Sequence, residues 1–123
     1  MFDHVEIKTV RFQACRRFYE AVFTPLQIEL KWADEQAAGF GQIEQDKVSF
    51  LIEGGEQSTP GHIAFRARHP AEVDAFHQAG IEAGFRCNGQ PGLRPHYAPN
   101  YYAAFLLDPD GNNIEAVTYL GDE

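Results

Sequence analysis

Cysteine, basic residues and long apolar runs are all scarce in this 123-residue chain. The two cysteines, Cys15 and Cys87, lie far apart and form no CxxC pair, which argues against a zinc ribbon or a thioredoxin-type motif and favours two reduced thiols. No apolar run approaches the roughly 20 residues that cross a bilayer, and the first residues lack the basic and apolar regions of a signal peptide. We therefore expect a cytoplasmic protein with no membrane partner.

Lysine and arginine are outnumbered by acidic residues, ten against eighteen, so the formal net charge is -8. This charge repels polyanions and removes the attraction on which most binding to nucleic acids and anionic membranes depends. We expect a small-molecule substrate and no nucleic-acid partner. The length and the 44% hydrophobic content suit a single domain with a modest core.

The first half of the chain passes from strand to helix periodicity and back. Residues 2–8 alternate like a strand, and apolar positions from Phe12 to Val22 then recur every three or four residues until Pro25 ends the helix. Residues 54–60 are the best candidate for a linker. The other expected strands of this half are residues 26–32, 38–43 and 48–52.

The second half repeats the order of a strand, a helix and three strands. Its helix begins at Pro70, where a missing backbone donor costs nothing. The turn Asp108-Pro109-Asp110-Gly111 is a strong hairpin signal, and residues 89–99 look like a Gly/Pro-rich loop. The expected strands of this half are residues 61–67, 85–87, 101–107 and 112–119.

The two halves align at an offset of 58 residues, which places His4-Val5-Glu6-Ile7-Lys8-Thr9 over His62-Ile63-Ala64-Phe65-Arg66-Ala67. The helix positions match as well, with Phe18 on Phe76 and Ala21 on Ala79. We predict an α+β domain over residues 1–123, built from two similar modules at about residues 1–55 and 60–123.

The alternation of side chains along a strand separates the histidines from the core. Val5 and Ile7, like Ile63 and Phe65, should pack against the helices, which leaves His4 and His62 on the helix-free face. Glu115 has the parity to share that face. Two imidazoles and one carboxylate can hold a divalent first-row metal and leave other positions open, as in a catalytic site. Taken singly, each histidine is more often structural, and Glu115 could be a plain exposed carboxylate.

Three motifs in this chain resemble those of the vicinal oxygen chelate superfamily, which includes glyoxalases, bleomycin resistance proteins and extradiol dioxygenases. They are His4-Val5 followed by Phe18-Tyr19, then Gly61-His62-Ile63-Ala64-Phe65, and then Asp108-Pro109-Asp110-Gly111-Asn112-Asn113-Ile114-Glu115. The resemblance implies two βαβββ modules whose curled mixed sheet surrounds a cleft, and a homodimer in which His4 can meet the partner's His62 and the partner's Glu115.

The resemblance also implies the chemistry of the site. The metal ligands would be His4, His62 and Glu115, and the ion would be divalent manganese, iron, nickel, cobalt or zinc. An enzyme of this superfamily, whether lyase, isomerase, dioxygenase or transferase, binds a small substrate through two adjacent oxygens and stabilises an oxyanion. The metal-free alternative is a bleomycin-type drug-binding protein, for which an acidic surface suits a cationic drug. A third possibility is an interaction module without a ligand.

One position departs from the glyoxalase I pattern, in which a glutamate on the fourth strand binds metal and acts as the base. Alignment of residues 44–47 on the turn that begins at Asp108 puts Leu51 opposite Glu115. Because leucine cannot bind metal or move a proton, the pattern is closer to fosfomycin-resistance proteins and extradiol dioxygenases. Candidates for the remaining roles are Glu53, His96 and Tyr101 in catalysis, and Arg94, Tyr97 and Tyr102 in substrate binding.

Overall fold

The computed structural model describes residues 3–58 and 61–121. Three of the expected module ends, residues 1, 60 and 123, therefore lie outside the described residues. The same is true of the last two residues of the candidate linker. The first half consists of β1 (Val5–Thr9), α1 (Phe12–Phe23), the short 3-10 helix η1 (Thr24–Leu26), β2 (Ile28–Ala33), β3 (Ala37–Gln42) and β4 (Phe50–Gly54). The second half consists of β5 (His62–Arg66), α2 (Pro70–Glu82), β6 (Arg86–Leu93), β7 (Tyr101–Leu107) and β8 (Asn113–Tyr119).

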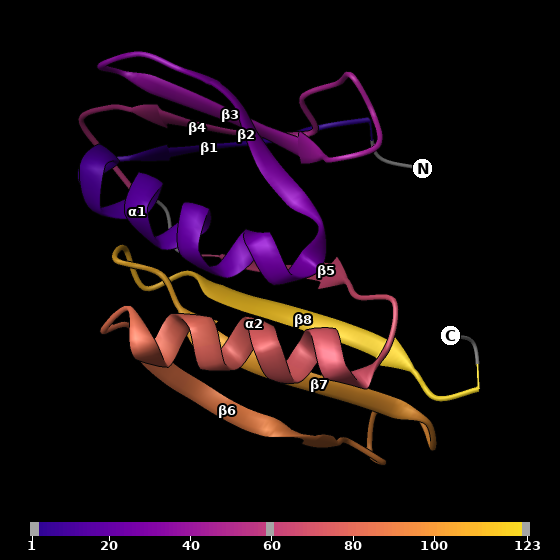
Figure 1. The fold of residues 1–123 in the computed structure, drawn as a ribbon. Coiled ribbons are helices and arrows are strands. Elements are labelled where there is room, and N and C mark those ends of the chain that lie inside the picture. The colour runs from indigo at the N-terminus through magenta and orange to yellow at the C-terminus, as the bar shows by residue number, and fades with distance from the viewer. Residues whose placement is uncertain (1–2, 59–60, 122–123) are drawn as a thin grey trace.

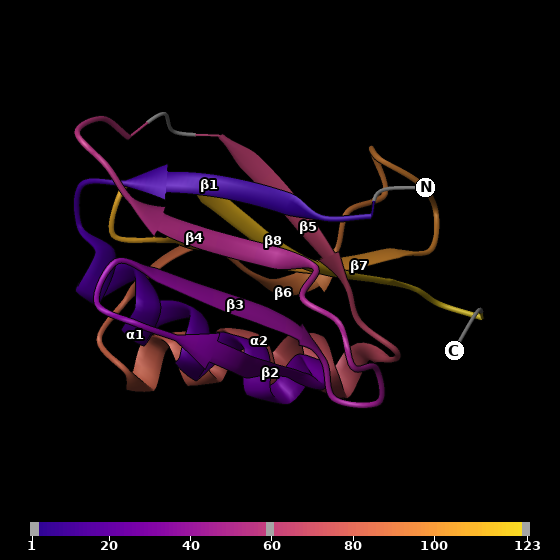
Figure 2. The ribbon, with the colours of Figure 1, turned by 90° about the horizontal axis from the view of Figure 1, so that it is seen from above.

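Each half forms its own four-stranded mixed sheet, in the order β1-β4-β3-β2 and β5-β8-β7-β6. The first strand of each half runs parallel to the last, and the remaining pairs are antiparallel. Figure 1 shows α1 beside the first sheet and α2 along the second, and Figure 2 shows the first sheet from above with the second beneath it. The predicted α+β fold of two βαβββ modules is confirmed, although the two described sheets share no strand pair and so do not close.

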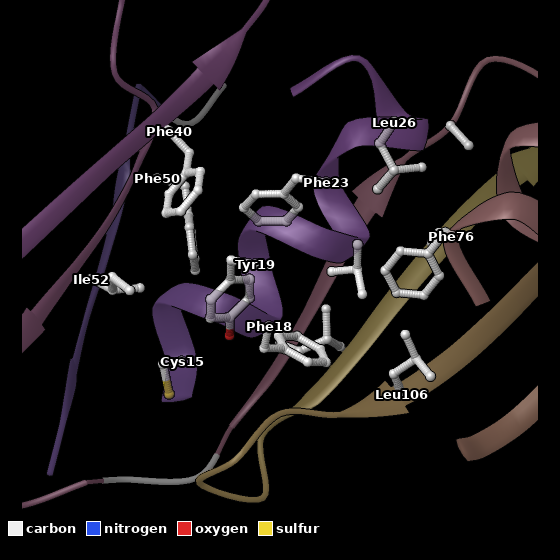
Figure 3. Packing of buried hydrophobic residues seen from close by; sticks show 14 of the residues in the cluster. Cys15, Phe18, Tyr19, Phe23, Leu26, Phe40, Phe50, Ile52, Phe76 and Leu106 are labelled. Atoms are coloured by element: carbon white, nitrogen blue, oxygen red, sulfur yellow. The ribbon is translucent and has the colours of Figure 1, made fainter. Parts of the chain in front are cut away.

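Helix α1 forms the centre of a core that both halves share. Its buried residues include Phe18, Tyr19 and Phe23, at the spacing of one helical face. Figure 3 shows these rings between the strands of the first sheet and the elements of the second half. The Phe23 ring lies 5.4 Å from Phe50 on β4 and 4.9 Å from Phe65 on β5. One continuous apolar cluster therefore joins the two modules.

The prediction of a short strand at 85–87 followed by a loop at 89–99 is wrong for residues 88–93, which belong to a strand. Strand β6 runs from Arg86 to Leu93 and includes Pro91. It lies at the edge of its sheet and pairs with β7 through two register shifts, so a missing N–H and extra glycines are tolerated. By contrast, β7 has the predicted bounds. No helix among the described residues is long and apolar enough to span a membrane.

Candidate functional site

Two of the three predicted metal ligands meet on the paired strands β5 and β8. His62 begins β5, and Glu115 stands opposite Ala64 in the parallel register. His62 Nε2 lies 2.7 Å from Glu115 Oε1. The Glu115 side chain is 1% exposed, whereas that of His62 is 51% exposed. The pair thus combines a buried carboxylate with an imidazole that solvent or a ligand can reach.

Tyr101 on β7 donates a hydrogen bond from its hydroxyl to the other carboxylate oxygen, Glu115 Oε2. Burial, and next the adjacent Glu115, raise the pKa of Tyr101 well above its ordinary value. The hydroxyl therefore stays protonated at neutral pH and acts as a donor. Because a buried carboxylate is costly without hydrogen-bond partners, His62 and Tyr101 together hold Glu115 in place.

A second apolar cluster surrounds this acid on the face away from the helices. It consists of Ala103, Phe105 and Val117, with Tyr101 and Tyr119 packed against it. Phe105 stands directly opposite Glu115 on the neighbouring strand, and its ring lies 6.2 Å from that of His62. Such surroundings lower the local dielectric constant and strengthen electrostatic interactions at the carboxylate.

Arg66 and Tyr119 border the same face, and sequence reasoning assigned a role to neither. The Arg66 guanidinium carbon lies 5.0 Å from the centre of the Tyr119 ring, which in turn lies 5.3 Å from the Tyr101 ring. Arg66 is four residues from His62, so the two-residue period of a strand places both on one side. The same period could therefore have predicted from the sequence that Arg66 lies on the face of His62.

His4, the third predicted ligand, lies apart from His62 and Glu115. Its side chain is 62% exposed, and its Nδ1 atom lies 2.9 Å from Asp3 Oδ1. In residues 3–58 and 61–121, no three histidine, cysteine or acidic side chains gather closely enough to hold a metal ion. Instead, His4 lines a cavity of about 400 Å³ between the halves, whose apolar lining includes Phe40, Phe50 and Phe65.

The register of β1 and β4 places Leu51 in the position that corresponds to Glu115. Leu51 stands opposite Glu6 in the first half, as Glu115 stands opposite Ala64 in the second. Glu6 and Ala64 are the residues that the 58-residue offset aligns. The equivalence inferred from the turn alignment therefore also holds in the strand pairing.

Glu53 lies opposite Lys8 on the neighbouring strand and forms an ion pair with its ammonium group. Both side chains are well exposed to solvent. This ion pair belongs to the first sheet, whereas the His62–Glu115 pair belongs to the second. The structure does not bring Glu53 together with the buried carboxylate within one chain.

The loop after β6 supplies three further candidates. Two of them, His96 and Tyr97, extend the row of aromatic rings that begins with Tyr101 beside Glu115. The Tyr97 ring lies 5.0 Å from Tyr101 and 4.3 Å from His96. The guanidinium carbon of Arg94 lies 5.3 Å from the centre of the Phe105 ring. The guanidinium also donates hydrogen bonds to the backbone carbonyls of Gln90 and Gly92. The loop candidates thus lie next to the second apolar cluster, with the guanidinium already engaged.

Tyr102 points to the opposite side of the sheet from its neighbour Tyr101. Its hydroxyl donates a 2.6 Å hydrogen bond to Asp74 Oδ1 on α2, and its ring packs against the main core. The hydrogen bond to Asp74, and then burial, raise the pKa of Tyr102 to about 12. The structure therefore places Tyr102 among the helix contacts and away from His62.

The fold and this site define a class of protein with paired βαβββ modules and a histidine–carboxylate pair on the helix-free face. The chain belongs to the glyoxalase/bleomycin resistance protein/dioxygenase superfamily, whose family model matches residues 1–116. The resemblance inferred from the three motifs is thereby confirmed. No curated protein gives a significant match.

Solved structures support the same assignment. A glyoxalase/bleomycin resistance protein from Albidiferax ferrireducens T118 is 32% identical, with a TM-score of 0.81 over 95% of this chain and 98% of that one. A lactoylglutathione lyase from Agrobacterium tumefaciens is 19% identical, with a TM-score of 0.70 over 100% and 98%. The fosfomycin resistance protein FosX from Mesorhizobium loti is also 19% identical, with a TM-score of 0.67 over 96% and 91%. The last two likenesses concern the fold alone.

Proposed function

We propose that this chain is a divalent-metal-dependent enzyme that binds a small substrate through two adjacent oxygens and stabilises an oxyanion. The observation that carries the proposal is the burial of Glu115 on the helix-free face, between His62 and Tyr101. Burying a carboxylate costs several kcal/mol before its partners compensate. The buried acid therefore depends on its two fixed partners, and together with a solvent-accessible imidazole it supports a built site.

The residue types at this position suit a first-row metal ion. An imidazole Nε2 and a carboxylate oxygen already converge within 2.7 Å, and both are ordinary ligands for manganese, iron, nickel, cobalt and zinc. A divalent ion held there would act as a Lewis acid on a substrate oxygen, worth several kcal/mol at the transition state. One chain supplies two ligands, and we propose that the third is the partner's His4.

A homodimer would bring the partner's His4 to the His62–Glu115 pair. Strands β1 and β5 each lie at the edge of a sheet, and exposed edges of this kind are usually covered. His4 directly precedes β1 and is well exposed, so it can reach another chain. The two free cysteines are compatible with a reducing compartment, and we therefore place this homodimer, one domain of two modules per chain, in the cytoplasm.

The other residues of the site would bind and orient the substrate. Tyr101 holds Glu115 by its hydroxyl and forms the apolar wall with Phe105. Tyr97, which is 58% exposed, and His96 lie at the outer end of the row of rings, where they would contact substrate and exchange protons. Arg94 would bind an anionic group of the substrate by donating to it the hydrogen bonds that it now donates to backbone carbonyls.

Leu51 limits the choice of base. Because the residue equivalent to Glu115 in the first half is apolar, the proton acceptor must come from elsewhere. Glu53, on the helix-free side of the first sheet and paired with Lys8, would reach the site only from the partner chain, like His4. A three-ligand site without the fourth-strand glutamate favours addition or dioxygenase chemistry over a glyoxalase I isomerisation.

Metal analysis tests this proposal directly. After dialysis against each of the five ions and removal of loosely bound metal, we expect the wild-type chain to retain metal by elemental analysis. His62→Ala and Glu115→Gln should lose it, whereas His69→Ala, an exposed histidine before α2, should retain it. A wild-type protein that binds none of these ions, and whose unfolding temperature a chelator leaves unchanged, would refute the metal-dependent enzyme.

Mixed dimers test whether the site is shared between chains. His4→Ala and Glu115→Gln should each abolish metal retention in a homodimer. A heterodimer of the two variants would have one site with both defects and one intact site, so the heterodimer separated after co-refolding should hold half of the wild-type metal content. If mixing restores nothing while the heterodimer forms, His4 does not contribute across the interface.

A metal-free drug-binding protein is the second candidate. It is favoured by the separation of His4 from the other ligands within one chain, and by the cavity of about 400 Å³ between the halves, whose lining combines aromatic and charged side chains. A net charge of -8 suits a cationic ligand of the bleomycin type. In that case His62→Ala, which changes no residue of the cavity lining, should leave the affinity for such a drug unchanged by calorimetry, whereas in the enzyme metal and activity disappear together.

A further inference from the structure

A second reactive pair of side chains lies on the opposite face of the second sheet from Glu115. Cys87 on β6 stands opposite Leu106, a core residue of the helix-covered face. Its sulfur lies 3.2 Å from Nε2 of His77, which α2 carries over that face. Cys87 is exposed, whereas His77 is only 6% exposed. A thiol open to solvent therefore has a fixed imidazole as its immediate neighbour.

An irregularity in β6 adds a third group to this pair. The register between β6 and β7 shifts after Cys87, so the Gly89 N–H donates a 3.3 Å hydrogen bond to the Cys87 sulfur. Bulges of this kind often re-aim groups at functional positions. The Gly89 N–H thus places a fixed hydrogen-bond donor at the sulfur, opposite in kind to the imidazole acceptor.

His77 is in the right state to accept the thiol proton. Burial lowers the pKa of His77, against the opposing effect of Asp74 one helical turn earlier. The imidazole is therefore neutral at pH 7 and free to act as a base. Asp74, which accepts the Tyr102 hydroxyl from β7, then favours the imidazolium once the proton has moved.

The other cysteine provides a contrast within the same molecule. Cys15 has no exposed surface, and its sulfur contacts the Thr9 hydroxyl and the Asp110 carboxylate. Burial raises the pKa of Cys15 to about 12. Reactivity of a thiol depends on its ionised form and on access, so Cys15 is inert while the chain is folded.

We infer that Cys87 is an oxidation site for small hydroperoxides, with His77 as the group that takes and returns the proton. The Cys87 thiolate attacks one peroxide oxygen, and the O–O bond breaks as sulfur gives up two electrons. A sulfenic acid forms on Cys87, and the departing oxide takes the proton from His77, giving water or an alcohol. None of these groups belongs to the His62–Glu115 pair, so the inference does not depend on the proposed function.

The test follows sulfenic acid formation at pH 7 with hydrogen peroxide, using dimedone trapping and mass spectrometry of the separated peptides. Cys87 should react in the wild type, and His77→Gln should slow it by about a hundredfold, the lower end of the contribution of a positioned acid–base group. His69→Gln, which changes an exposed histidine next to the same helix, should react like the wild type. Cys15 should stay unmodified in every folded sample.

Two results would overturn the inference. One is an equal rate of Cys87 oxidation in the wild type and in a folded His77→Gln variant, with folding checked by circular dichroism. The other is a wild-type rate no faster than that of a free peptide of residues 84–90, which holds the same thiol without His77. The peptide comparison needs no variant, so it decides the matter even if His77→Gln fails to fold.

Discussion

The hydroxyl of Tyr19 on α1 donates a 2.7 Å hydrogen bond to Oδ2 of Asp108, which begins the turn between β7 and β8. Asp108 also accepts hydrogen bonds from the Asn112 side chain and from the backbone N–H groups of Asp110 and Asn112. Next to it, Arg11 donates to Asp110. Figure 1 shows this turn beside the beginning of α1. The hairpin of the second half is therefore fastened to the helix of the first by a buried polar network.

Tyr19→Phe should destabilise the chain by about 1–3 kcal/mol, because the substitution removes a donor from a buried carboxylate and leaves the apolar ring in place. The free energy of unfolding in urea measures this loss. Tyr102→Phe is the matched control, since it removes a similar bond to the exposed Asp74 and should cost about 1 kcal/mol or less. Equal losses in the two variants would contradict a special role for the buried network.

Stability should fall in acid partly through Asp110. Burial alone would raise the pKa of Asp110, but hydrogen bonds from Thr9, Arg11, Cys15 and Ser58 outweigh it and lower the pKa. A lowered folded-state pKa stabilises the chain above the unfolded value of about 3.9, and this contribution is lost as pH falls through the folded value.

Urea unfolding between pH 7 and pH 3 measures this dependence. Asp110→Asn should be less stable than the wild type at pH 7 and should lose less stability on acidification. Glu35→Gln, which changes an exposed acid, serves as the control and should follow the wild-type curve. Parallel curves for Asp110→Asn and the wild type would show that Asp110 does not carry the effect.

Tyr101→Phe should destabilise the chain by about 1–3 kcal/mol, because Glu115 then keeps a buried oxygen without its donor. If the site holds metal, the freed oxygen also changes the affinity, which titration with the ion would detect alongside urea unfolding. Tyr97→Phe removes a hydroxyl from a ring that is 58% exposed and should leave both quantities near wild type. An unchanged stability in Tyr101→Phe would mean that water replaces the hydroxyl at no cost.

Gly41→Ala should destabilise the first sheet, because an added Cβ at Gly41 would lie 1.8 Å from the backbone oxygen of Lys47. The loop before β4 would have to move, and such overpacking costs about 1–3 kcal/mol or more. Gly54→Ala is the control in the same sheet, since its nearest neighbouring atom would be 3.5 Å away. Thermal unfolding of the two variants side by side should show a clear loss for Gly41→Ala only.

The sequence was sufficient to predict the order of elements and the face on which each strand residue lies. The three- and four-residue spacing from Phe12 to Val22 and the alternation from His62 to Arg66 are local properties, and both appear in the structure. The turn at Asp108 was predictable because proline presets the backbone angle there and Gly111 accepts a positive φ. Strand β6 was not, since its glycines and proline are compatible with an edge strand only when a neighbour such as β7 accepts the register shifts.

What the tertiary structure decided is which of these residues meet. Alternation assigned His4, His62 and Glu115 to helix-free faces, but the distance between strands of different sheets depends on how the shared core packs, and that packing leaves His4 apart. The same packing sets Tyr19 against Asp108, and α2 sets His77 against Cys87. Periodicity is local to a few residues and therefore determines the side on which a group lies, whereas contacts between distant residues follow from the register of strands and the placement of helices.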